Sequence, residues 1–196
     1  MNTQPLPDTD PRRAAILSAA SAVFARYGFR RSAMEDIAAQ AGLSRGALYL
    51  HYRNKQDIFR SIVQAYFDLA ETRMRAALAA GTDPVATLQA AFEAKIGPEM
   101  APLFESPHGA ELLDANFATA ADIVARGEAR LTALLADWLA AQRDAGGAVF
   151  DGDAQSLAAT IIAALGGVKH TGGRYAAIRA DMARLAQILG RGLSPS

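Results

Sequence analysis

The sequence contains no cysteine, so disulfide bonds, thiolate metal sites and a cysteine nucleophile are excluded. It also lacks an apolar run long enough for a membrane helix. Its longest uncharged stretch lies between Asp153 and Lys169, whereas a membrane span needs about 20 residues. The segment Met1 to Pro11 is polar and proline-rich and has no signal-peptide pattern. We therefore expect a cytoplasmic protein with no membrane contact.

The sequence also lacks the common catalytic motifs. We find no glycine-rich phosphate loop, no G-x-S-x-G turn and no H-E-x-x-H pair, and there are only three histidines. The expectation is a protein that is not an enzyme and holds no cofactor and no metal. The rival interpretation is a helical enzyme whose catalytic residues converge only in space. His108, Glu111 and Asp114, spaced three apart, are compatible with a metal site, a polar pocket edge or a solvated face.

The net charge is zero, but the charges are unevenly distributed. Residues 1–60 carry nine Lys or Arg against five Asp or Glu, while residues 61–196 carry eleven against fifteen. An excess of basic residues in one part of a chain indicates a polyanionic partner. An uneven distribution of this size can also arise by chance, so the basic excess alone does not indicate a function without a supporting motif.

Helical periodicity is present along almost the whole chain, and no segment alternates as a strand does. Asp10 and Pro11 begin a first helix that ends at Tyr27, before Gly28. Further helices are expected at 33–41, 45–52, 55–80, 84–95, 111–117, 119–145, 153–168 and 175–189, with broken turns over 97–110. The sequence therefore predicts an all-α fold.

The segment from about residue 33 to 52 has the parts of a helix-turn-helix. Ser32 and Glu35 form a capping-box pattern at the start of its first helix. Gly42 provides the tight turn, because glycine tolerates a positive φ. Leu48 and, by its register, Tyr52 are expected in the core.

The remaining face of the second helix has chemistry suited to DNA. Arg45 lies in its first turn, where an arginine can donate two parallel hydrogen bonds to guanine. Gly46 and Ala47 are small enough for close approach to the bases. The predicted DNA-binding residues are Arg31, Ser32, Ser44, Arg45, Gly46, Ala47, Tyr49, His51 and Lys55. For His51 an ordinary surface position is the alternative. A protein that coats DNA without sequence preference is a rival to a specific reader.

The motif resembles the DNA-binding domain of the TetR family over about residues 12–63. The resemblance is carried by Met34-Glu35-Asp36-Ile37-Ala38, Ala41-Gly42-Leu43-Ser44-Arg45-Gly46-Ala47-Leu48-Tyr49, His51-Tyr52-Arg53-Asn54-Lys55 and Ile58-Phe59. Ala47, Leu50 and Gln56 depart from residues common in that family. The resemblance implies a dimeric transcriptional regulator, with a ligand-released repressor as the expected form.

The resemblance also implies a domain organisation. We expect a flexible arm at 1–10, a three-helix DNA-binding domain at 11–57, and a bundle of about six helices at 58–196 for dimerisation and ligand binding. The expected partners are double-stranded DNA, a second copy of the chain, and a small apolar or aromatic effector. Pocket candidates are Phe67, Phe104, His108, Phe117, Trp138 and His170. Candidates for the dimer interface are Leu165, Gly166, Ile178, Met182, Leu185 and Leu189. A DNA-binding dimer without a sensor is the alternative.

Overall fold

The structure is a computed structural model that describes residues 10–81, 83–169 and 174–195, with only the backbone at 114–117. The described residues form α-helices and one 3₁₀ turn, with no strand among them, which confirms the all-α prediction. None of the described helices is long and apolar enough to cross a membrane. The predicted arm at residues 1–9 lies outside the described residues.

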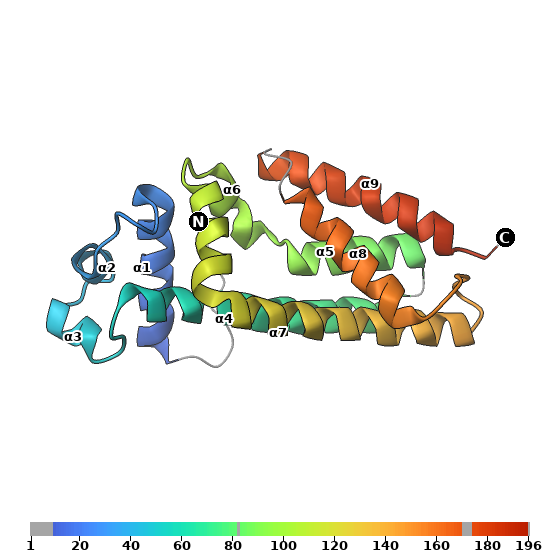
Figure 1. Cartoon of the computed structure of the whole chain (residues 1–196), viewed down its shortest axis with the longest axis horizontal. Helices are drawn as coiled ribbons and strands as arrows, with labels where there is room; N and C mark the ends of the chain where they lie inside the picture. Colours follow the sequence, from blue (N-terminus) through green and yellow to red (C-terminus); the bar gives the residue numbers. More distant parts are fainter. Residues whose placement is uncertain (1–9, 82, 170–173, 196) are drawn as a thin grey trace. The chain divides into compact units, whose positions relative to one another are not determined.

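The first three helices are α1 (Pro11–Tyr27), α2 (Met34–Gln40) and α3 (Arg45–Tyr49), drawn in blue to cyan in Figure 1. The Asp10 carboxylate accepts a hydrogen bond from the Arg12 amide, so the predicted cap of α1 is confirmed. The capping box predicted for α2 is wrong in its residues. Ala33 is the N-cap, and its amide donates to the carboxylate of Asp36 at 2.9 Å.

Six further α-helices follow in the described part of the chain. They are α4 (Lys55–Ala80), α5 (Pro84–Lys95), α6 (Ala101–Glu105), α7 (Gly109–Asp144), α8 (Ala154–Val168) and α9 (Tyr175–Leu193), with the 3₁₀ turn η1 (Pro98–Met100) before α6. One of them, α6, lies where broken turns were predicted. The predicted helices at 111–117 and 119–145 form a single element. They are joined through Ala120, whose φ of −132° and ψ of 25° mark a kink.

The chain divides into two compact units, Met1–Leu69 with Pro102–Ala125, and Ala70–Ala101 with Arg126–Ser196. The first unit thus contains α1 to α3 and also the segment that follows Pro102. Its core includes three aromatic rings, those of Phe24, Phe29 and Phe59, whose centroids lie 4.9 to 5.8 Å apart. The functional division at residue 57 remains a prediction.

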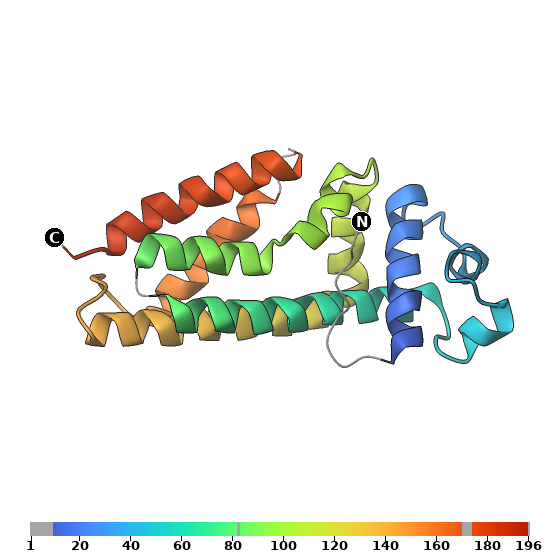
Figure 2. The same cartoon turned by 180° about the vertical axis from the view of Figure 1, so that it is seen from behind.

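The second unit is built around α5, α8 and α9. In both views α5 and α9 lie side by side (Figures 1 and 2). Gly190 permits this approach, because a Cβ atom at that position would lie 2.6 Å from the Cα of Val85. The side chains of Leu88, Phe92 and Leu165 are fully buried in this core.

Candidate nucleic-acid interface

The helix-turn-helix predicted from the sequence is formed by α2, a short turn and α3. Met34, Ile37 and Leu48 are buried and fix the two helices against the core. In the turn, Gly42 has a φ of +67°, as the sequence predicted, and the Leu43 amide donates to the Ala38 carbonyl at 2.9 Å. Tyr52 is also buried, which confirms its predicted core position. The scaffold thus leaves one face of α3 uncovered.

Ser44 and Arg45 begin α3. The Ser44 hydroxyl accepts a hydrogen bond from the Ala47 amide at 3.1 Å, so its side chain caps the helix. The Arg45 guanidinium pairs with the Glu35 carboxylate at 2.8 Å and lies 5.5 Å from the centre of the Tyr49 ring. Both partners of the ion pair are exposed, so the pair contributes little stability and is readily exchanged for another anion.

The rest of the predicted reading face is accessible to a ligand. Gly46 and Tyr49 are exposed, while Ala47 and His51 are half-buried. A Cβ atom at Gly46 would meet no atom within 4 Å, so the space above the backbone is open. The structure adds Leu50 at the end of α3, 86% exposed, a residue that sequence reasoning treated only as a departure from a pattern. An exposed leucine suits contact with a thymine methyl group.

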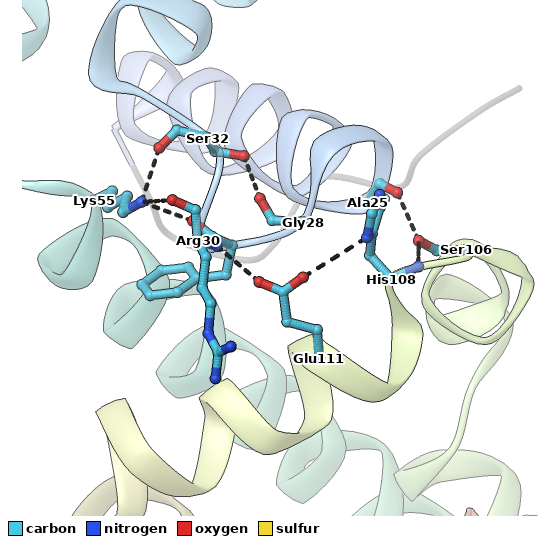
Figure 3. A network of polar contacts seen from close by, with 9 residues as sticks. Ala25, Gly28, Arg30, Ser32, Lys55, Ser106, His108 and Glu111 are labelled. Atoms are coloured by element: carbon cyan, nitrogen blue, oxygen red, sulfur yellow. Dashed lines mark hydrogen bonds and ion pairs between the residues drawn. The ribbon is translucent and has the colours of Figure 1, made fainter.

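Two residues predicted to contact DNA, Lys55 and Ser32, make hydrogen bonds within the domain. The Lys55 ammonium donates to the carbonyl oxygens of Phe29, Arg30 and Ser32 at 2.8, 2.8 and 2.9 Å. All three of its N–H groups are therefore used within the domain. The buried Ser32 hydroxyl donates to the Gly28 carbonyl at 2.6 Å. Lys55 and Ser32 thus hold the connection between α1 and α2 (Figure 3). Arg31, which precedes Ser32, is exposed.

The same connection is held from α7. The Glu111 carboxylate accepts a hydrogen bond from the Arg30 amide at 2.8 Å and lies 3.7 Å from the His108 imidazole (Figure 3). The Ser106 hydroxyl donates to the Ala25 carbonyl at 2.6 Å. Gly28 faces this carboxylate with a φ of +79°, and a Cβ atom there would collide with it. His108, predicted as a pocket residue, therefore lies beside the loop that carries Arg30 and Arg31.

Replacing Lys55 with methionine is expected to destabilise the protein by about 2–4 kcal/mol. The change leaves three carbonyls without their charged donor, and a hydrogen bond to a charged group contributes about 1.5–3 kcal/mol. Urea unfolding followed by circular dichroism measures the loss. The exposed Arg53, which pairs only with Asp57 one turn away, provides the control: Arg53→Met should cost less than about 0.5 kcal/mol. Equal losses for the two variants would contradict the role given to Lys55.

The pocket candidates are divided between the two units. Phe67, Phe104 and His108 belong to the first, and Trp138 belongs to the second. Phe67 and Trp138 are buried and Phe104 is half-buried. Burial of an aromatic ring is also what simple core packing produces, so their role in a pocket stays a prediction. The side chain of Phe117 and the whole of His170 lie outside the described residues.

Three of the predicted interface residues are already covered by their own chain. Leu165, Ile178 and Met182 are fully buried within the single chain, where α9 packs on α5 and α8. Gly166, Leu185 and Leu189 are half-buried. The outer face of α9 instead carries Ile188, which is 70% exposed. On α8 the exposed residues between Ser156 and Gly167 are small: Ser156, Ala159, Thr160, Ala163, Ala164 and Gly167.

Comparison with known proteins agrees with the position of this motif. Residues 16–62 match the family model described as bacterial regulatory proteins, tetR family. The matched segment contains α2 and α3 and most of α1.

Relatives match over similar limited lengths. The transcriptional activator FasR of Mycolicibacterium smegmatis is 38% identical over 85 residues, which are 43% of this chain and 39% of the relative. The repressor BepR of Brucella suis is 39% identical over 85 residues, 43% of this chain and 41% of the relative. The matches therefore span about two fifths of these relatives. A transcriptional regulator from Cytophaga hutchinsonii has the same fold, with a TM-score of 0.75 at 18% identity, over 95% of this chain and 100% of that one.

Proposed function

We propose that the chain is a TetR-family regulator that binds DNA sequence-specifically, because residues 16–62 match the model of that family. The observation that carries the proposal is the exposed face of α3, with Arg45 in its first turn, within the segment that matches the family. We infer further that the protein acts as a homodimer and that a small effector releases it from DNA. Relatives include both activators and repressors, and we propose a repressor.

Arg45 is proposed to read a base, with α3 in the major groove. Its guanidinium already lies over Tyr49 and pairs with Glu35, which limits its conformations before DNA arrives. Exchange of the carboxylate for guanine O6 and N7 then preserves the charge-assisted hydrogen bonds. The open space above Gly46 supports a close approach of the helix to the bases. Arg31 and Tyr49 are proposed to contact phosphates.

Dimerisation is proposed through the outer faces of α8 and α9. Small exposed residues on α8 allow a partner helix to come close. Ile188 on α9 is exposed to water in the single chain and supplies an apolar side chain for the interface. A two-fold axis would place two α3 helices about 34–36 Å apart, one turn of DNA. The operator is therefore proposed to be pseudo-palindromic.

Release is proposed to act through the loop between α1 and α2. Glu111 bonds to the backbone of Arg30, so a displacement of α7 moves the segment that positions Arg30 and Arg31. An effector that prefers the displaced state would weaken operator binding by its differential affinity, commonly about 1–3 kcal/mol.

The test is selection of an operator from random DNA, followed by Arg45→Ala. The substitution is expected to cost about 1–3 kcal/mol at the selected operator and to relax the preference at one base pair. Fluorescence anisotropy with the operator and with single-base variants measures both effects.

Arg53→Ala is the matched control, because Arg53 is an exposed arginine just beyond α3. It is expected to weaken binding to all sequences alike, as loss of a phosphate contact does. An Arg45→Ala protein with unchanged base preference would exclude Arg45 as the base reader. Failure to enrich any sequence would exclude specific DNA recognition.

A further inference from the structure

Leu50 has the most exposed large apolar side chain in the described part of the chain, with 86% of its surface in contact with water. A single exposed leucine is common on protein surfaces and by itself indicates nothing. Its place in the fold is what matters here. Leu50 is the C-cap residue of α3, and its φ of −70° and ψ of −24° continue the helix by one residue.

The register of α3 puts Leu50 at the centre of the uncovered face. An α-helix turns by about 100° per residue, so residues two positions apart lie on opposite faces. Leu48 is fully buried, and Gly46 and Leu50 are each two positions from it. Gly46 and Leu50 are also four positions apart, so they lie one above the other on one face. This face is directed away from the core of the domain.

The polar side chains of α3 lie at one edge of the same face. The Arg45 guanidinium pairs with Glu35 of α2 and lies 5.5 Å from the centre of the Tyr49 ring. Arg45 and Tyr49 therefore mark the edge near α2, and Leu50 projects beside them. The face thus combines a polar edge, which can donate hydrogen bonds, with an apolar centre.

The space next to Leu50 is open. Side chains on a helix lean toward its N-terminus, so the side chain of Leu50 lies toward the turn that contains Gly46. Gly46 has no side chain, and a Cβ atom there would meet no atom within 4 Å. A flat base edge can therefore approach the backbone at Gly46 and contact the Leu50 side chain from its N-terminal side.

The chemistry of leucine limits what it can recognise on DNA. It has no hydrogen-bonding group, so it cannot hold a phosphate or distinguish donors from acceptors on the bases. In the major groove the thymine C5-methyl group is the apolar group that a base pair of ordinary DNA presents. Contact between this methyl group and Leu50 removes apolar surface of both from water, which is favourable.

We propose that Leu50 recognises the 5-methyl group of one thymine in each half of the operator and is a specificity-determining residue. This inference rests on the proposed function, because it names a second base that the same face selects. Arg45 and Leu50 are five residues apart, about 7.5 Å along the helix. Successive base pairs are about 3.4 Å apart, so the thymine lies about two base pairs from the guanine proposed for Arg45.

The test uses the full-length protein and the operator selected from random DNA. Each thymine in one half of the operator is replaced in turn by deoxyuridine, which differs from it only by the missing methyl group. At one position the replacement is expected to weaken wild-type binding about fourfold, the effect of one buried methyl group. Fluorescence anisotropy measures the affinities. If no replacement weakens binding by at least twofold, the proposal is wrong.

Three variants assign the effect to Leu50. Leu50→Ala should bind the thymine and deoxyuridine operators equally. This ratio of two affinities does not depend on how much of the protein is folded. Arg45→Ala should keep the fourfold ratio while it loses the preference for guanine. Val149→Ala, which shortens an exposed apolar side chain of the second unit, should leave both affinities unchanged. A fourfold ratio that persists in Leu50→Ala would assign the methyl group to another residue and overturn the proposal.

A gain of affinity provides an independent check. The thymine found by the scan is replaced by cytosine, with guanine opposite, and then by 5-methylcytosine, which carries the methyl group at the same ring position. Methylation is expected to strengthen wild-type binding about fourfold relative to unmethylated cytosine, and to have no effect on Leu50→Ala. The absence of any gain in the wild type would contradict recognition of the methyl group.

The outcome also distinguishes this inference from the function on which it rests. If selection enriches no DNA sequence, the proposed function fails and the role of Leu50 fails with it. If an operator is found but deoxyuridine binds as well as thymine at every position, the function stands and the role of Leu50 alone is excluded. In that case an exposed Leu50 that is not needed for DNA binding points to contact with another protein.

Discussion

Ile188→Glu is expected to convert the proposed dimer into monomers and to lower operator affinity by about a hundredfold or more. Ile188 is an apolar residue of α9 that is 70% exposed in the single chain, so the substitution leaves the fold of the subunit intact. In a two-fold interface each substitution is present twice, and a buried unpaired carboxylate costs several kcal/mol. The molecular mass measured by sedimentation equilibrium and the affinity measured by operator titration should therefore decrease together.

Val149→Glu is the matched control, because Val149 is also an exposed apolar residue but lies in the loop before α8. This variant is expected to remain dimeric. If Val149→Glu dissociates the dimer while Ile188→Glu does not, the interface lies elsewhere on the subunit. Leu185, on the stripe predicted from the sequence, is a poorer choice. It is half-buried within the chain, and a charge there would also disturb the packing of α9.

The sequence predicted most of the helices because their ends are fixed by local chemistry. Asp10, Ser44, Asp83 and Asp153 each accept a hydrogen bond from the first turn of the helix that follows, as their residue types suggest. Ser32 has an equally good local pattern, but its hydroxyl bonds to Gly28 instead. The choice between Ser32 and Ala33 as cap depends on the path of the preceding loop, which local sequence does not specify.

Periodicity predicted which face of a helix is apolar, but not which surface covers it. Ile178 and Met182 were assigned to the dimer interface because they repeat at heptad-like spacing. The structure buries them against α5 and α8 of the same chain. An apolar stripe is needed for any packed helix, whether the partner belongs to the same subunit or to another. Ile188, which lies outside that stripe, is exposed and is therefore the contact that we propose instead.

The polar contacts that hold the loop between α1 and α2 could not be predicted from the sequence. Glu111 and Arg30 are 81 residues apart, and the bond joins a side chain to a backbone amide. Lys55 was predicted to contact a DNA phosphate because it is basic and follows the motif. The fold brings three backbone carbonyls to its ammonium group, and these lie more than 20 residues away in the sequence. The reading face itself was predictable, since Arg45, Gly46 and Tyr49 lie on a short helix whose register Leu48 fixes.

Lys169→Met is expected to stabilise the ligand-free protein at pH 7. The pKa of Lys169 falls from its ordinary value of 10.5 to about 8 through burial, so protonated Lys169 opposes folding. A decrease of this size corresponds to a cost on the order of 3 kcal/mol. Methionine has a similar length and carries no charge, so the variant should recover a large part of that cost. Chemical denaturation at equal protein concentrations measures the gain, since stability of a dimer depends on concentration.

The dependence on pH distinguishes this effect from better packing. Below pH 8 the lysine is protonated in both the folded and unfolded states, so the full cost is present. Between pH 8 and 10.5 the unfolded chain binds the proton and the folded protein does not, so wild-type stability rises with pH. The difference in free energy of unfolding between Lys169→Met and the wild type should therefore decrease between pH 8 and 10. Arg75→Met is the control. It removes a cation that stays charged over this range, so its difference from the wild type should not change with pH. A constant advantage across this range would mean that Lys169 carries no buried charge.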